Sequence, residues 1–294
     1  MMAQSARHSA DRLLPASLSR FAAAVIVVII AVPVLYLLVL ALSPNSTIAL
    51  GGSGLSHLTV SNFAGMWSAA PLLSGLGNSV IIAGSSSVLA VILGMGAAYP
   101  LARLSFRGRK TMLYSLLGSQ TISSIALLLP LFIILAGIQG ILGITLIGSY
   151  VPVILTYMTF GLPLATWVCF TYLRNMPKDL EEAALVDGCT RVTALRRVVA
   201  PLMAPAMVVS LVFAFLVGWN DVLFASALTN SQTHTVAIAL QQFGATQAAN
   251  VGAAPLYGDL MAASLVSALP VVALYLGFQR YLVHGLASGA LSGV

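Results

Sequence analysis

Residues 174–201 read RNMPKDLEEAALVDGCTRVTALRRVVAP and form the most highly charged stretch of the sequence. Nine charged side chains fall within 24 of these residues, although the 294-residue chain carries only 13 Lys or Arg and 7 Asp or Glu. The flanks are nearly uncharged: residues 111–173 hold no charge, and residues 198–279 hold only two carboxylates. A membrane-spanning helix needs about 20 apolar residues, so each flank has room for two helices and a loop. The charged stretch is therefore expected to be an aqueous loop between two pairs of membrane helices.

The composition supports a membrane protein. Charged residues make up 7% of the chain, whereas soluble proteins carry about 25%. Apolar residues make up 59% and the mean hydropathy is +1.00. These values exclude an ordinary cytosolic enzyme, a disordered protein and a nucleic-acid-binding domain, despite a pI near 9.6. The two cysteines, Cys169 and Cys189, cannot form a disulfide framework.

A third uncharged stretch, residues 21–102, precedes the other two, and turn residues divide all three. We therefore expect an all-α, polytopic membrane protein with six transmembrane helices. The expected helices cover about 21–43, 77–102, 111–137, 150–173, 201–226 and 259–279. The remaining segments are an N-terminal segment (1–20), an outer loop (44–76), an inner loop (174–200) and a C-terminal tail (281–294).

Charge placement predicts the orientation. With six helices both termini share one side, and all 13 Lys and Arg then fall on it. Because basic residues in short loops stay cytoplasmic, the chain is expected to be N-in and C-in. The first helix is expected to be an uncleaved anchor, since its apolar run of about 23 residues exceeds the 7–15 of a signal peptide.

The expected helices carry mild polar residues but no charge near their centres. This pattern argues against an ion-coupled secondary carrier, which usually keeps ionisable groups there. The polar side chains suit a neutral polar ligand, and they equally suit hydrogen bonds between helices. Four candidate positions on a substrate path are Asn78, Gln120, Trp167 and Asn220. Asn220 could contact a ligand or a partner at the outer mouth, or simply anchor the helix end.

The charged loop is expected to contain a short helix, a turn and a second helix. Asp179 as N-cap with Glu182 three residues on predicts a capping box. Leu180, Ala183, Ala184 and Asp187 share one face at helical spacing, and Gly188 predicts a stop and turn. Such a helix could dock into a groove on a partner. Alternatively, it is a solvated loop in which Glu182 only caps its own helix.

The loop resembles a known motif. Glu182-Ala183-Ala184, three residues, Gly188, nine residues, Val198, one residue and Ala200-Pro201 resemble the EAA loop of ABC importer permeases. Val198 stands where the motif has Ile, and Ala200 where it has Leu. The resemblance extends over about residues 77–294. It includes Asn78-Ser79, Ala97-Ala98-Tyr99, Ala102-Arg103, Trp219-Asn220-Asp221 and the tail 279–290, which are similar to the maltose-type, carbohydrate-uptake subfamily.

The resemblance implies the type I ABC importer permease fold, in the cell inner membrane, with alternating access as the transport mechanism for a sugar, oligosaccharide or polyol. It implies three kinds of protein partner besides the lipid bilayer: a pair of ATP-binding-cassette subunits, a second permease, and an extracytoplasmic substrate-binding protein. It implies no nucleic acid partner. The residues implied to couple ATP hydrolysis to transport are Glu182, Ala183, Ala184, Asp187, Gly188 and Pro201.

The chain is not expected to be an enzyme or to hold a cofactor. Neither of its two lysines, Lys110 and Lys178, completes a P-loop, so a separate subunit must bind ATP. Two other readings remain as alternatives. One is the secondary carrier. The other is an intramembrane aspartyl protease that pairs Asp221 with Asp259, although both carboxylates are expected at the outer interface.

Overall fold

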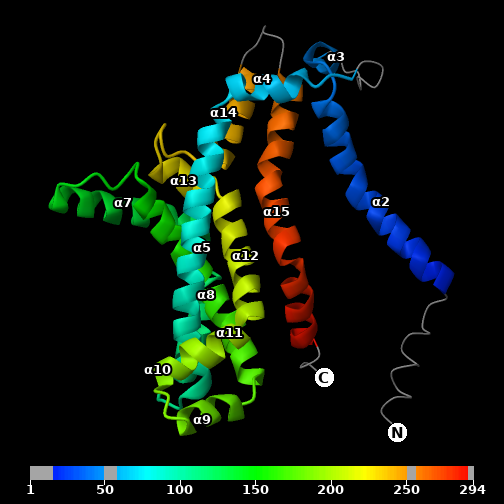
Figure 1. Cartoon of the computed structure of the whole chain (residues 1–294). Coiled ribbons are helices and arrows are strands. Elements are labelled where there is room, and N and C mark those ends of the chain that lie inside the picture. The colour runs from blue at the N-terminus through cyan, green and yellow to red at the C-terminus, as the bar shows by residue number, and fades with distance from the viewer. Residues whose placement is uncertain (1–15, 50–57, 250–255, 291–294) are drawn as a thin grey trace. The chain divides into compact units, whose positions relative to one another are not determined.

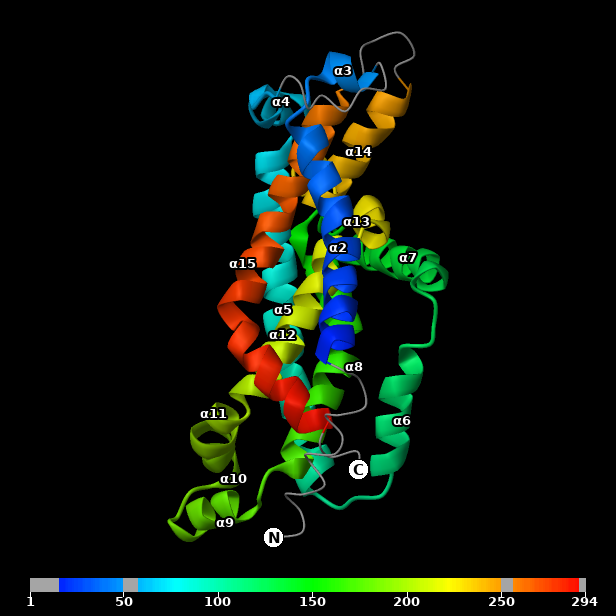
Figure 2. The same cartoon turned by 90° about the vertical axis from the view of Figure 1, so that its right-hand side faces the viewer.

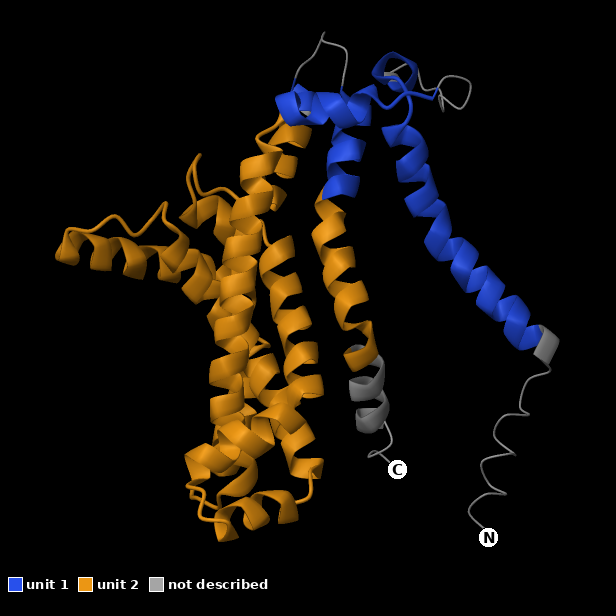
Figure 3. Ribbon diagram, viewed as in Figure 1, with its two compact units in different colours: residues 1–69, 246–266 blue, residues 70–245, 267–294 orange. Residues whose placement is uncertain are grey.

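A computed structural model of the chain describes residues 16–49, 58–249 and 256–290, and these residues form helices and connections without a strand (Figure 1). The chain divides into two compact units (Figure 3). Unit 1 contains residues 1–69 and 246–266, and unit 2 contains residues 70–245 and 267–294.

Unit 1 contains α2 (Ala16–Ala41), α3 (Asn45–Ala49), α4 (Ser61–Ala69) and the first turns of α15 (Tyr257–Ala290). Most apolar side chains of α2 are exposed, as a helix that faces lipid requires. Three side chains hold the connections together. Asn62 Nδ2 donates to the carbonyl oxygens of Ala41 and Ser43, both at 2.8 Å. Asn45 accepts from the Gly258 amide at 2.7 Å and donates to the Asp259 carboxylate at 3.3 Å.

The core of unit 2 consists of α5 (Leu72–Arg103), α8 (Tyr150–Asn175) and α12 (Ala204–Asn220), which pack against one another (Figures 1 and 2). Small residues line their contacts. A Cβ added at Gly94 of α5 would lie 2.9 Å from Ala165 Cβ of α8, and one added at Gly161 would lie 3.0 Å from Ala214 Cβ of α12. Small faces let membrane helices approach to backbone contact, so glycine permits this three-helix core.

Five described helices are long and apolar enough to cross a membrane, and a bent helix pair brings the number to six. The five are α2, α5, α7 (Ser124–Leu142), α8 and α15. The bent pair joins Arg191–Leu202 to α12 through a bend of 75°. This agrees with the predicted all-α, six-helix membrane fold.

The expected helix at 201–226 is broken. It is divided among α11 (Ala200–Leu202), α12 and α13 (Leu223–Leu228). The bend falls at Met203, between Pro201 and Pro205, each of which lacks the amide hydrogen that continues a helix.

The expected helix at 111–137 is likewise two helices, α6 (Arg109–Ser119) and α7. The break covers Gln120 to Ser123, where side chains compete with the helical backbone. Thr121 donates its hydroxyl hydrogen to the Gly118 carbonyl at 2.7 Å, and Gln120 Nε2 donates to the Phe160 carbonyl at 3.2 Å. Polar side chains therefore end α6 before a single span can form.

Other boundaries differ by a few residues. α5 begins five residues before the expected 77, and the outer loop 44–76 holds α3 and α4. α14 (Val236–Ala249) lies between the last two expected spans. α15 continues through Ala290, so much of the expected tail 281–294 is helical. Most of the expected N-terminal segment 1–20 lies outside the described residues.

Candidate functional site

The inner loop contains α9 (Asp179–Val186) and α10 (Arg191–Ala194), joined by a glycine turn. The N-cap of α9 is Lys178, without a side-chain capping bond. The predicted capping box of Asp179 and Glu182 is therefore wrong. The amides of Glu181 and Glu182 bond instead to the Lys178 carbonyl, at 2.9 and 3.0 Å. The Lys178 carbonyl thus closes the first turn of α9, one residue before the expected N-cap at Asp179.

The turn after α9 depends on Gly188, whose φ is +86°. The Cys189 amide donates to the Ala184 carbonyl at 3.0 Å, and the Gly188 amide donates to the Leu185 carbonyl at 3.1 Å. This is the Schellman pattern, in which a residue with left-handed backbone closes the helix. Space is not the constraint, because a Cβ at position 188 would meet nothing within 4 Å.

We expect Gly188→Val to lower transport several-fold, because a β-branched residue at positive φ is strained by about 1–2 kcal/mol. Gly188→Asn is the matched control, since Asn tolerates this backbone region far better. The measurement is uptake by membrane vesicles at equal amounts of inserted protein. Equal uptake by both variants would show that the turn conformation has no role in transport.

The two sides of α9 have opposite exposure. Glu181 and Ala184 are buried, whereas Val186 is 87% exposed. Leu180, Glu182, Ala183 and Asp187 are also exposed. The expected face of Leu180, Ala183, Ala184 and Asp187 is thus divided, with Ala184 turned inward. The outward side presents two carboxylates beside small and apolar side chains, and it is named here the outer face of α9: Leu180, Glu182, Ala183, Val186 and Asp187.

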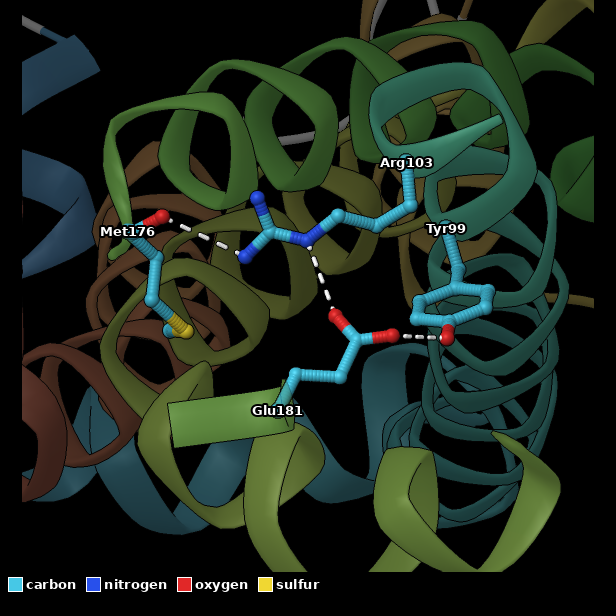
Figure 4. Close-up of polar contacts among 4 residues, drawn as sticks. All are labelled: Tyr99, Arg103, Met176 and Glu181. Atoms are coloured by element: carbon cyan, nitrogen blue, oxygen red, sulfur yellow. Dashed lines mark hydrogen bonds and ion pairs between the residues drawn. The ribbon is translucent and has the colours of Figure 1, made fainter. Parts of the chain in front are cut away.

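The inward side of α9 is anchored to the end of α5 by a buried ion pair (Figure 4). Arg103 Nε donates to Glu181 Oε2 at 3.0 Å, and the Tyr99 hydroxyl donates to Glu181 Oε1. Arg103 also donates through Nη2 to the Met176 carbonyl, at 3.2 Å. The charged side chains of Arg103 and Glu181 are only 5% and 8% exposed. Buried charges of this kind persist when each is paired and hydrogen-bonded, as both are here.

Sequence reasoning selected Glu182 and missed Glu181. A signal existed: Glu181 lies three and four residues before Ala184 and Leu185, so it shares their apolar side of the helix. Tyr99 and Arg103 both belong to the segments that resemble the carbohydrate-uptake subfamily. They lie four residues apart on one side of α5, but the sequence did not indicate their partner. The pairing itself joins positions 78 residues apart, which helical spacing cannot reveal.

The second half of the loop leads into the membrane core. Thr190 caps α10 by accepting from the Thr193 amide at 3.3 Å. A π-helical turn, η1 (Leu195–Val199), follows and continues into α11. Val199 is buried in the cluster that contains Leu173 and Met203. Pro201 lies in the first turn of α11 and is exposed.

The structure does not bring the four candidate path residues together. Asn78 is buried and fully engaged: it donates to the Gln232 and His234 carbonyls, both at 2.9 Å, and accepts from the Tyr150 hydroxyl at 2.8 Å. Asn220 is exposed and bonds to its own helix, and Trp167 packs beside Phe170. Of the four, only Gln120 lines the cavity of unit 2 described below.

The sequence matches a known family over residues 87–288, described as the binding-protein-dependent transport system inner membrane component. The trehalose transport system permease protein SugB of Mycobacterium tuberculosis is 36% identical over 263 residues, which cover 89% of this chain and 92% of the relative. The trehalose/maltose permease MalG of Thermococcus litoralis is 33% identical, covering 74% and 75%. The diacetylchitobiose permease NgcG of Streptomyces coelicolor is 31% identical, covering 89% and 84%.

The fold is also found among solved structures. A chain of a bacterial ABC transporter that imports the acidic polysaccharide alginate superimposes with a TM-score of 0.70, covering 92% of this chain and 99% of that chain at 17% identity. Membership of a binding-protein-dependent system implies an ATPase and a binding protein as partners. The chain therefore belongs to the inner-membrane permeases of binding-protein-dependent ABC importers, of the carbohydrate-uptake type, and is a multi-pass transport subunit rather than a catalytic one.

Proposed function

We propose that this permease works in an assembly with a second, different permease, a pair of ATP-binding-cassette subunits and an extracytoplasmic substrate-binding protein. The charge distribution, with basic residues gathered around α9, supports a cytoplasmic position for this helix. ATP binding closes the ATPase pair and opens the transport path outward to receive the substrate. Hydrolysis then returns the path to its inward-open state.

The observation that carries the proposal is the two-sidedness of α9. Its outer face is the docking surface for the ATPase: Glu182 and Asp187 supply charge, Ala183 allows close approach, and Val186 adds apolar contact. Its inner side is fastened through Glu181 to Arg103. A displacement of α9 is therefore transmitted directly to α5. It also reaches α12 through α10, η1 and α11, in which Pro201 precedes the 75° bend.

The proposed cargo is a neutral sugar, oligosaccharide or polyol. Support comes from the relatives, which are named for trehalose, trehalose/maltose and diacetylchitobiose transport. The uncharged centres of the spans agree with an uncharged cargo. Trehalose is the first substrate to test, because the trehalose permease shares 36% identity over 89% of this chain.

Two measurements test the proposal. The tagged chain, purified from its native membrane, is expected to retain an ATPase subunit and a second permease, both identifiable by mass spectrometry. The purified assembly, in liposomes with its binding protein, is expected to take up labelled trehalose only when ATP is present. Recovery of the chain alone, with uptake driven by an ion gradient, would establish a secondary carrier instead.

A further inference from the structure

A cavity of about 360 Å³ lies in unit 2, between the α6–α7 connection, α8 and the end of α12. This volume is within the range of small-molecule sites. Small and aliphatic side chains line part of the cavity. Its polar and aromatic lining residues are Gln120, Ser124, Tyr157, Phe160, Asp221 and Phe224. Three separate segments therefore contribute polar groups to one concave surface.

Asp221 is held rigidly at this cavity through one of its two oxygens. Oδ2 accepts from the Tyr157 hydroxyl at 2.7 Å and from the amides of Phe224 and Ala225 at 2.9 and 3.1 Å. The two amides begin α13, so the carboxylate fixes the turn between α12 and α13. These three hydrogen bonds fix the orientation of the carboxylate, and none of them is made to its other oxygen, Oδ1.

Several polar atoms of the lining have no protein partner. Within the residues that the structure describes, Asp221 Oδ1, Gln120 Oε1 and Ser124 Oγ make no hydrogen bond. Gln120 is nevertheless oriented, because its Nε2 donates to the Phe160 carbonyl at 3.2 Å. Asp221 Oδ1 and Gln120 Oε1 can only accept hydrogen bonds, and the Ser124 hydroxyl can donate or accept. A ligand that supplies several hydroxyl donors would satisfy them.

Aromatic rings supply the apolar part of the cavity. The rings of Phe160 and Phe224 lie with their centroids 5.0 Å apart at 41°. Tyr157 is buried, and its ring fits because residue 218 is glycine: a Cβ there would lie 2.9 Å from Tyr157 Cδ2. Flat rings beside a few oriented polar groups suit the alternating C–H and O–H surfaces of a sugar ring.

We propose that this cavity is a contact site for the transported sugar on this subunit. Asp221 Oδ1 and Gln120 Oε1 accept from sugar hydroxyls, and Ser124 Oγ bonds a further hydroxyl. Phe160 faces the C–H surface, and the buried Phe224 ring packs against Phe160. The inference rests on the proposed function, since it names where a neutral carbohydrate meets this chain. Of the four path residues expected from the sequence, the proposed site keeps Gln120 and leaves out Asn78, Trp167 and Asn220. It adds Tyr157, Phe160 and Asp221.

The charge of the lining selects the ligand class. A fixed carboxylate repels acidic sugars and other anions, and the described residues that line the cavity include no Lys, Arg or His to offset it. A metal ion would need more ligands than one carboxylate, and no group of three or more His, Cys, Asp or Glu suited to a metal occurs among the described residues. The lining therefore suits a neutral ligand that is rich in hydroxyl groups.

The test uses cysteine labelling of the assembled importer in liposomes. Ser124→Cys places a thiol in the cavity at the start of α7, and Ser119→Cys places one at the end of α6, outside the lining. Labelling of the parent protein, which keeps Cys169 and Cys189, is subtracted. During turnover with binding protein and trehalose, the reaction of Ser124→Cys with a maleimide is expected to slow about threefold or more, because only the unoccupied fraction reacts. Ser119→Cys is expected to react at the same rate with and without trehalose.

Two results would overturn the site. One is unchanged labelling of Ser124→Cys while trehalose uptake proceeds. The other is equal protection of both cysteines, which reports a conformational change or coverage by another subunit. Absence of ATP-driven uptake of any neutral sugar contradicts the proposed function instead, so the two failures are distinguishable.

A second variant does not depend on labelling. Gln120→Ala is expected to lower the maximal uptake rate about fivefold, the usual effect of losing one hydrogen bond. Ser119→Ala, at the end of α6 and outside the lining, is expected to leave uptake unchanged. Equal rates for the two variants would contradict a ligand contact at Gln120.

Discussion

Glu181→Ala is expected to uncouple ATP hydrolysis from transport and to lower the stability of the purified chain. The substitution leaves Arg103, whose side chain is 5% exposed, buried without its carboxylate. Removing one partner of a buried ion pair typically costs about 3–5 kcal/mol. Because the pair fastens α9 to α5, we expect α9 to lose its fixed position while the membrane helices stay inserted. The measurements are the melting temperature in detergent and the amount of sugar transported per ATP hydrolysed.

The adjacent residue provides the matched control. Glu182 is exposed and makes no hydrogen bond through its side chain among the described residues. Glu182→Ala is therefore expected to leave the melting temperature unchanged and to weaken retention of the ATPase. Of two neighbouring carboxylates on one short helix, only Glu181 is thus expected to affect the melting temperature.

A double variant separates the ion pair from other effects of the single change. Replacing both partners of a buried pair by apolar residues is often nearly neutral, so Glu181→Ala combined with Arg103→Leu is expected to recover much of the lost stability. If instead the double variant is less stable than Glu181→Ala alone, the buried charge is not the cause. Tyr99→Phe removes only the hydroxyl donor, and a smaller loss of about 1 kcal/mol is expected.

Gly94→Leu is expected to prevent normal packing of unit 2. A Cβ at this position would lie 2.9 Å from Ala165 Cβ and 3.0 Å from the Thr166 amide nitrogen, and the second atom is backbone that cannot turn aside. α5 and α8 would have to separate along their contact, and enlarging a packed interior commonly costs about 1–3 kcal/mol or more. We expect a much lower yield of folded protein in the membrane and faster proteolysis in detergent.

Gly96, two residues along the same helix, is the matched control. A Cβ at this position would meet nothing within 4 Å, so Gly96→Leu is expected to give nearly the parent yield and protease resistance. Both variants add the same apolar volume to the same helix, and both raise helix propensity. A similar loss for the two would contradict the close approach of α5 and α8.

The sequence predicted the membrane architecture because charge is costly in lipid. Twenty apolar residues without charge have few alternatives to a buried helix, so six such segments were readable without any contact information. The charged loop likewise predicted a helix and a turn at Gly188, since turns depend on residues close in the chain. The coupling role, which the EAA resemblance implies, stays a prediction.

Predictions failed where local polar groups or paired prolines compete with the helix. The segment 111–137 is apolar enough for one span, but Gln120 and Thr121 bond away from the helical pattern, and α6 ends there. The segment 201–226 bends at Met203, between two prolines. In each case the segment is apolar enough to span the membrane, as predicted, but one or two side chains break its helix.

The sequence by itself determined the fold class, the family and the position of the charged inner loop, because hydrophobicity, charge and turn chemistry act over short distances along the chain. Only the tertiary structure decided which carboxylate of the loop is buried. Glu181 and Glu182 are chemically the same, and α9 could turn either one inward; Arg103 and Tyr99, 78 and 82 residues away, select Glu181. It also decided that Asp221, rather than Asn220, meets Tyr157 at a cavity. Contacts between distant segments depend on how helices pack, and spacing along one segment does not encode that packing.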